Sequence, residues 1–194
     1  MDVSSSTGMQ PHASNFMIAG VHVRQGRASD VDAVASLLVR TWRTNYRGLV
    51  SDGFLDHLSS DEQATRQLRL MSRPGACHRV AVEGSTVLGF ACGGPARDPA
   101  DRWRHELYAL YVAPRLQGHG IGRRLLEALW RDLGVQAAEE MGVWVLAGND
   151  DARAFYERVG GRPRAAGWLD LGDRRYPQVS YVLDPPGGGA RIAS

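Results

Sequence analysis

The sequence predicts a mixed α/β domain in which helices flank a central mixed sheet of about six or seven strands. The chain has 194 residues, which suits one domain. Hydrophobic residues make up 43% and charged residues 23%, the ordinary balance of a globular protein. A hairpin pattern is followed by a strand–helix–strand pattern, and this order predicts a mixed sheet covered by helices.

The first part of the domain is predicted to contain a short strand and two helices. Residues 20–24 alternate as a strand does. Ser29 or Asp30 then caps a helix. The apolar stripe of this helix lies on one face: Val31, Val34, Leu38 and Trp42. After a break, residues 61–71 predict a second helix.

The second part alternates strands and helices. A Glu-Gly-Ser turn between two strands marks a hairpin. Helices are predicted over residues 121–133 and from Asn149 or Asp150 to the pair Gly160-Gly161. The predicted strands are residues 79–83, 86–92, 105–112, 143–146 and 178–183. The whole order is therefore β-α-α-β-β-β-α-β-α-β.

The two ends of the chain differ from the domain between them. Residues 1–19 are polar and aperiodic and are expected to be a flexible leader. Residues 185–194 begin with Pro-Pro-Gly-Gly-Gly and are expected to be a flexible tail, which leaves residues 20–184 as the domain. No stretch approaches the roughly 18 apolar residues that span a bilayer, and the start has no secretory apolar core. We therefore expect a cytoplasmic protein without a membrane partner.

Charge and cysteine content exclude some classes of function. The formal net charge is +2, with 23 basic and 21 acidic residues, which is too balanced to indicate nucleic acid as a partner. Cys77 and Cys92 form no CxxC pair and have no nearby His at zinc spacing. We expect two buried or half-buried thiols, no disulfide and no metal site.

The most informative stretch is residues 110–126, where a strand ends, a glycine-rich loop follows and a helix begins. The first turn of a helix leaves N–H groups unpaired and carries partial positive charge. Gly118, Gly120 and Gly122 have no Cβ atoms to keep an anion away from these groups. The loop is therefore predicted to bind phosphate. Three arginines add positive charge around it: Arg115, Arg123 and Arg124.

Three phosphate-binding motifs compete for this loop. A P-loop requires Lys and Ser or Thr after its last glycine, and both are missing. A GxGxxG dinucleotide fingerprint fails in both registers, because the third glycine would fall at Arg123 or at Leu125. The third pattern, Gln117-x-x-Gly120-x-Gly122, fits.

With this pattern the chain resembles the GNAT superfamily of acetyl-CoA-dependent N-acetyltransferases. The family motif is [Gln/Arg]-x-x-Gly-x-[Gly/Ala] at a strand-to-helix junction. A second family signature follows about 30 residues later: the strand 143–146, Asn149, Ala154-Phe155-Tyr156 and Gly160-Gly161. The resemblance covers about Val21 to Leu183, and residues 42–58 are similar to the N-terminal region of some small bacterial members.

The resemblance implies how the cofactor is held. Main-chain amides from Gln117 through Arg123 are expected to bind the CoA pyrophosphate, and the strand end at Val112 is expected to bind the pantetheine arm. Family members splay this strand from the strand 143–147, so that the thioester enters the gap and the Val112 amide lies near its carbonyl. The full set of expected cofactor-binding residues is Leu110, Tyr111, Val112, Gln117, Gly118, His119, Gly120, Ile121, Gly122, Arg123 and Asn149. His119 occupies a variable position of the motif, and Asn149 contacts the cofactor or caps the helix.

The resemblance also implies catalytic residues. Tyr156 is the candidate general acid, because a Tyr with a pKa near 10 can protonate a thiolate whose conjugate pKa is near 8.5; the alternative is that it packs in the core beside Phe155. Glu106 is the candidate base for the amine, acting through water, or else a solvated carboxylate at a strand start. His105 is an alternative base on the opposite face of the strand, so only one of the two points into the gap.

Four aromatic residues are weaker candidates for an acceptor pocket: Trp42, Tyr46, Tyr108 and Trp168. Each is also a candidate for ordinary packing.

The expected activity is transfer of an acetyl group from acetyl-CoA, as co-substrate, to a primary amine of a small molecule or peptide. The chain has no GxSxG nucleophile elbow, and its cysteines lack a base in the sequence, so direct attack is favoured over a covalent enzyme intermediate. The alternative is a CoA-binding regulatory or interaction module that has lost its chemistry. Because many relatives are dimers, the resemblance also allows a homodimer.

Overall fold

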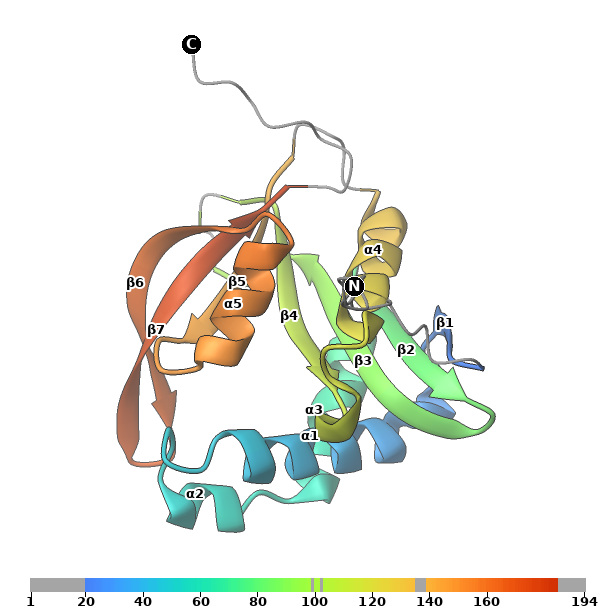
Figure 1. The fold of residues 1–194 in the computed structure, drawn as a ribbon, viewed down its shortest axis with the longest axis horizontal. Helices are drawn as coiled ribbons and strands as arrows, with labels where there is room; N and C mark the ends of the chain where they lie inside the picture. The colour runs from blue at the N-terminus through green and yellow to red at the C-terminus, as the bar shows by residue number, and fades with distance from the viewer. Residues whose placement is uncertain (1–19, 99, 102, 135–138, 185–194) are drawn as a thin grey trace, which may run out of the picture.

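The computed structural model describes residues 20–98, 100–101, 103–134 and 139–184. Over these residues, seven strands form one mixed sheet in the order β1-β2-β3-β4-β5-β7-β6 (Figure 1). The strands are β1 (His22–Gln25), β2 (Cys77–Glu83), β3 (Thr86–Pro95), β4 (His105–Val112), β5 (Met141–Leu146), β6 (Arg162–Leu171) and β7 (Arg174–Leu183). The helices are α1 (Val31–Asn45), α2 (Asp52–Asp56), α3 (Ser60–Met71), α4 (Ile121–Leu133) and α5 (Asp150–Arg158), with 3-10 turns η1 (Ala28–Asp30) and η2 (Pro114–Leu116). The predicted mixed α/β class is confirmed.

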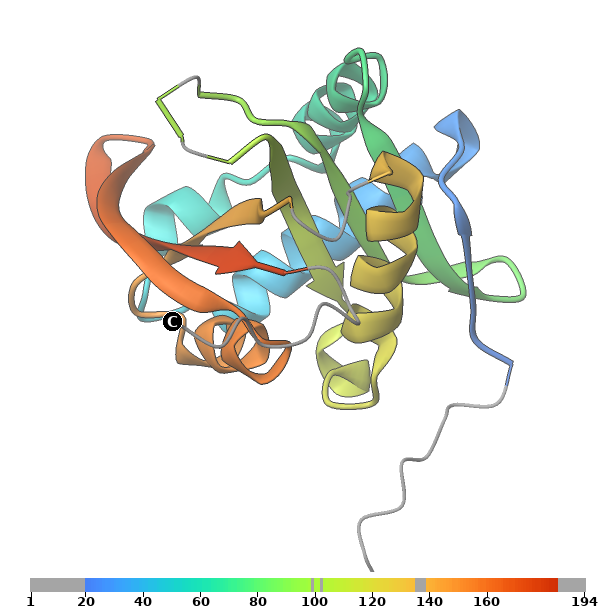
Figure 2. The same ribbon diagram turned by 90° about the horizontal axis from the view of Figure 1, so that it is seen from above.

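Helices lie on both sides of the sheet (Figure 2). Helix α4 packs on β2, β3 and β4, and its Leu125 and Leu129 are fully buried in a core that also contains Tyr156 of α5. Helix α1 packs on β3, β4 and α3 and forms a second core. Strand β3 serves both cores because its side chains alternate between the two faces. Ala91 belongs to the first core and Phe90 to the second.

Strands β4 and β5 separate after a short parallel contact. They pair only at His105–Met141 and Glu106–Gly142, and the two strands then diverge (Figure 1). At this junction the Trp103 ring lies against Gly142, where an added Cβ would meet the ring at 2.0 Å. The predicted splay between the strand that ends at Val112 and the strand 143–147 is therefore confirmed.

Some elements differ from those predicted. Strand β6 was not expected, and β7 begins at Arg174 rather than at residue 178. Most β6 side chains are exposed, so the strand shows little apolar alternation and is held by main-chain pairing with β7. The short helix α2 was also not expected; the Ser51 hydroxyl caps it by accepting from Phe54 N at 3.4 Å. The predicted leader and tail lie outside the described residues.

Candidate functional site

The glycine-rich loop forms an open cradle of main-chain amides. Gly118 and Gly120 have φ angles of +78° and +80°, a left-handed conformation that strongly favours glycine. A Cβ added at either glycine would meet nothing within 4 Å. Among the described residues, no main-chain hydrogen bond uses the N–H groups from Gly118 to Arg123, and the first helical bond runs from Arg124 N to Gly120 O at 3.1 Å. The free amides of the loop and of the first turn of α4 are therefore available to an anion.

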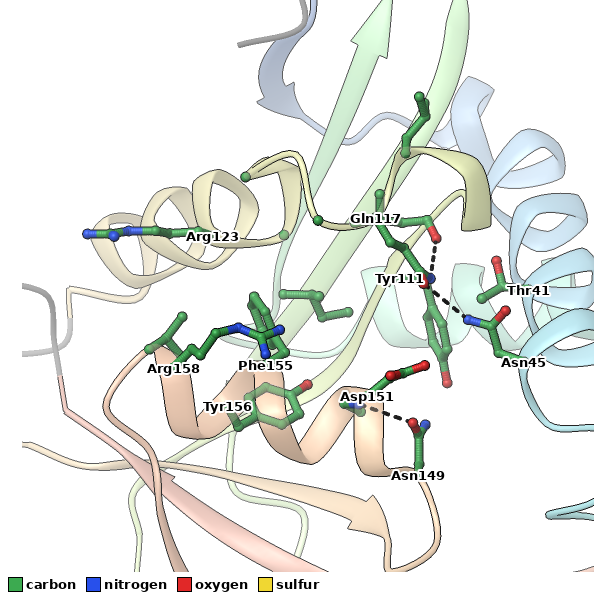
Figure 3. A pocket seen from close by; sticks show the side chains of 18 of the residues that line it. Thr41, Asn45, Tyr111, Gln117, Arg123, Asn149, Asp151, Phe155, Tyr156 and Arg158 are labelled. Carbon is green, nitrogen blue, oxygen red and sulfur yellow. Dashed lines mark hydrogen bonds between the residues drawn. The ribbon is translucent and has the colours of Figure 1, made fainter. Parts of the chain in front are cut away.

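A cavity of about 600 Å³ extends from this cradle between β4, α4 and α5 (Figure 3). All of the predicted cofactor-binding residues except His119 and Ile121 line it. The Ile121 side chain is buried in the core, and the exposed His119 ring contacts its own loop through Nδ1, 2.8 Å from Gln117 O. Neither side chain therefore forms part of the cavity wall.

Two arginines line the cavity, and they differ in their partners. Arg123 was predicted to add charge at the phosphate, but its side chain runs along α4 and pairs with Glu127 at 2.8 Å (Figure 3). Arg158 was not predicted. It has no ion pair with the described residues, and its side chain reaches over Phe155 at the cavity wall (Figure 3). Its position in the last turn of α5, one turn from Phe155, was the available signal in the sequence.

Strand β4 presents main-chain polar groups to the splay. Ala113 N donates to Leu88 O at 2.8 Å across the antiparallel β3–β4 pair. Hydrogen-bonding direction alternates along a strand, so the backbone of Tyr111 also faces β3. The backbone groups of Leu110 and Val112 then face the gap toward β5. The Gln117 side chain confirms this direction, because its Nε2 donates to Val112 O at 3.1 Å.

A second cavity of about 210 Å³ lies in the splay, lined by β4, β5 and side chains from α1 and α3. Five residues line both cavities: Tyr46, Leu110, Tyr111, Ala152 and Tyr156. The two cavities therefore meet inside the splay, with the first opening toward the glycine cradle and the second toward α3.

Tyr156 stands at the meeting point of the two cavities. Its side chain is 6% exposed and contacts the rings of Phe155 and Tyr181, with centroids 5.2 and 6.1 Å away. Burial, and to a smaller degree the nearby Tyr46, raises the pKa of its hydroxyl well above the usual range. The hydroxyl has no hydrogen-bond partner among the described residues, and it points across the cavity toward Tyr111 (Figure 3). Tyr156 thus belongs to the core by its ring and to the cavity by its hydroxyl.

A network of polar aromatic groups forms the wall opposite Tyr156. Trp42 Nε1 donates to the Tyr111 hydroxyl at 2.9 Å, and Trp42 stacks on Tyr46 at 4.4 Å between centroids. Burial raises the pKa of both Tyr46 and Tyr111, and the nearby Tyr111 and Asn149 side chains partly offset the rise in the pKa of Tyr46. Asn149 Oδ1 also accepts from Ala152 N at 3.1 Å, so this residue caps α5 while it lines the cavity.

The remaining predicted residues lie at varying distances from the cavities. Glu106 is 1% exposed, and both carboxylate oxygens are bound by Arg97, with Arg97 N 2.9 Å from Oε2. His105 instead faces Glu139, 3.4 Å away. Neither Glu106 nor His105 lines either cavity. Tyr108 lines the second cavity, whereas Trp168 is 58% exposed and lines neither.

The described residues contain no group of three or more His, Cys, Asp or Glu side chains placed to hold a metal ion. No helix within the described ranges is both long enough and apolar enough to cross a membrane. Cys92 is buried and Cys77 half-buried, both as free thiols, as expected.

Comparisons with known proteins agree with this arrangement. A sequence model of the acetyltransferase (GNAT) family matches residues 34–161. A protein described as a probable N-acetyltransferase of Mycobacterium tuberculosis is 30% identical over 178 residues, which cover 87% of this chain and 98% of that protein. An uncharacterized N-acetyltransferase of Bacillus subtilis is 30% identical over 141 residues, 71% of this chain and 78% of that protein. The PaiA N-acetyltransferase of Thermoplasma acidophilum, solved with coenzyme A, has the same fold with a TM-score of 0.59 at 19% identity, covering 82% of this chain and 97% of that one.

Proposed function

This chain belongs to the acetyltransferase (GNAT) family, and from that premise we propose that it transfers an acetyl group from acetyl-CoA to a primary amine by direct attack. The observation that carries the proposal is the meeting of the two cavities at the hydroxyl of Tyr156. One cavity leads to an anion-binding cradle, and the other reaches the same hydroxyl from the opposite side. Two substrates can therefore meet at one proton donor.

The residues of the first cavity fit a CoA molecule. The diphosphate is placed at the free amides from Gly118 to Arg123, where the left-handed glycines leave the approach open. Arg158, which has no ion pair with the described residues, supplies a charge for a phosphate. The backbone of Leu110 and Val112 faces the gap and can pair with the amide groups of the pantetheine arm as a neighbouring strand would.

Val112 and Tyr156 then act on the reacting thioester. The Val112 N–H donates to the carbonyl oxygen as negative charge develops there. The nitrogen–carbon bond forms, the carbon–sulfur bond breaks, and Tyr156 donates its proton to the leaving sulfur. Burial raises the pKa of Tyr156, so leaving this side chain as a tyrosinate is costly. The proton that the attacking amine loses therefore passes to Tyr156 as Tyr156 gives its own proton to the sulfur. The balance is an amide and a free thiol, with no net proton released.

An acceptor that arrives as an ammonium ion needs a base to remove its proton. Glu106 remains the sequence-based hypothesis for this base. Its carboxylate is engaged by Arg97, so a base role requires that a water reach an oxygen that already accepts a hydrogen bond. An acceptor that enters as the neutral amine needs no such base.

An assay of free CoA with a panel of amines tests the proposal. We expect CoA release that depends on both acetyl-CoA and an amine, with intersecting lines in initial-rate plots because both substrates are bound together. Parallel lines would indicate a covalent acetyl-enzyme and contradict direct attack. Binding of CoA without release from any amine would favour a non-catalytic module.

A further inference from the structure

The second cavity carries an unusual balance of charge for a site that receives an amine. Its lining includes two arginines, Arg66 of α3 and Arg97 of the loop before β4. No Asp or Glu is among the described residues that line it. An ammonium group is commonly held by carboxylates, and this cavity offers none at its wall.

The two arginines are not equivalent. Arg97 lies over the Tyr108 ring, 5.1 Å from its centroid, and its charge is matched by the buried Glu106. Arg66 is exposed at the cavity and has no ion pair with any described residue. Arg73, which does not line the cavity, also lies over the Tyr108 ring, 5.8 Å from its centroid. Arg66 and Arg97 therefore line this end of the cavity with Arg73 near Tyr108, and the one carboxylate beside them, Glu106, is paired with Arg97.

Polar and apolar side chains divide the rest of the wall. Gln67 is 3% exposed, and its Oε1 has no hydrogen-bond partner within the part of the chain that the structure describes. Trp42, Phe54 and Trp144 add aromatic surface to the wall. The arginine end lies beside α3, whereas Tyr156 comes from α5, which packs on the other core. An acceptor that fills the cavity therefore presents one end to Tyr156 and the other to the cations.

Resting on the proposed function, we propose that the acceptor is a compact amine whose far end carries an anionic group, a carboxylate or a phosphate, bound by Arg66. A guanidinium binds either group through paired N–H donors. Positive charge in the cavity also disfavours the ammonium form of the acceptor, so it favours the neutral nucleophile. Polycations such as polyamines and aminoglycosides are disfavoured by the same charge.

The test uses matched pairs of amines that differ in one anionic group. Suitable pairs are butylamine with 4-aminobutyrate and ethanolamine with O-phosphoethanolamine; the second pair separates phosphate from carboxylate. Spermidine serves as the polycation. We expect kcat/KM for at least one anionic member to exceed that of its uncharged partner by about tenfold or more.

Arg66→Gln is the matching variant. Its KM for the anionic acceptor should rise about tenfold, while the KM for the uncharged partner and for acetyl-CoA stay within about twofold. Arg69→Gln removes the same charge from the same helix, but Arg69 lines neither cavity, so it should change none of these values. Equal losses for charged and uncharged acceptors, or a preference for spermidine, would overturn the inference.

A second readout separates this inference from the proposed function. Trp42 and Trp144 line the cavity, so their fluorescence reports acceptor binding in the presence of CoA without turnover. Absence of CoA release with every amine would contradict the proposed function alone. The ratio of Kd values within each matched pair, in wild type and in Arg66→Gln, would still decide the inference, and a ratio near one in wild type would refute it.

Discussion

Replacement of Tyr156 by Phe is the sharpest test of the catalytic proposal. The hydroxyl has no hydrogen-bond partner among the described residues, and the ring contacts with Phe155 and Tyr181 remain in the variant. The change therefore leaves no buried polar group unpaired, and the free energy of unfolding should change by less than about 0.5 kcal/mol. A lost general acid costs roughly 100-fold in rate at the least, equivalent to about 2.7 kcal/mol of transition-state stabilisation.

The assay is release of free CoA under saturating substrates, with the Kd for CoA measured by calorimetry and stability by urea unfolding. Tyr181→Phe is the matched control. The Tyr181 hydroxyl donates to Glu157 at 2.8 Å and accepts from Arg153 at 3.1 Å, and it lines neither cavity. This control should lose about 1–3 kcal/mol of stability and keep its kcat. A kcat for Tyr156→Phe within twofold of wild type, or a parallel loss of CoA affinity, would refute the reasoning.

Four further outcomes are expected. Gly120→Ala should weaken CoA binding by about tenfold because it places a methyl at the cradle opening. Gly48→Ala is the control: Gly48 has φ +79° and lies in open space, so both variants should lose about 1 kcal/mol of stability, but Gly48→Ala should leave the Kd for CoA unchanged. Arg158→Gln should raise the Kd for CoA several-fold at low salt and less at high salt; equal Kd values at low salt would contradict its role. In a pH series, kcat should show no alkaline loss from Tyr156 ionisation up to about pH 10, because burial raises its pKa. The hydrogen bond from Arg24 lowers the pKa of Asp30, so its stabilisation is present above pH ~4 and is lost as the pH falls further; Asp30→Asn should therefore destabilise the fold to urea at neutral pH and have little effect near pH ~2.

Much of the fold was predictable because its strands and helices carry clear apolar periods. The bounds of β4 and α4 agree with those predicted, and the glycine loop between them has a residue pattern that depends on backbone conformation alone. Strand β6 was missed because it gains its stability from pairing with β7 rather than from burial. The Gly172-Asp173 pair between these strands was the available signal, since it is a common two-residue hairpin turn.

Side-chain partners in the site were less predictable than its location. The sequence indicated Glu106 and His105 on opposite faces of one strand, but it could not show that Arg97, nine residues before Glu106, would take that carboxylate. The acceptor cavity is assembled from α1, α3, β4 and β5, so Arg66 and Trp144 come to line one cavity only after folding. Such a set has no fixed spacing in the sequence, and only tertiary structure brings it together.

The separation of β4 from β5 gives the proposed enzyme two entrances to the reaction site. In the proposed mechanism, acetyl-CoA would enter along the side of α4 and α5, and the amine would enter along the side of α1 and α3. Because the two cavities share only the residues at their junction, the proposed mechanism allows the substrates to load in either order and each product to leave by its own cavity. A conjugate in which the CoA sulfur is covalently linked to an anionic amine would pass through the gap between β4 and β5 and occupy both cavities at once.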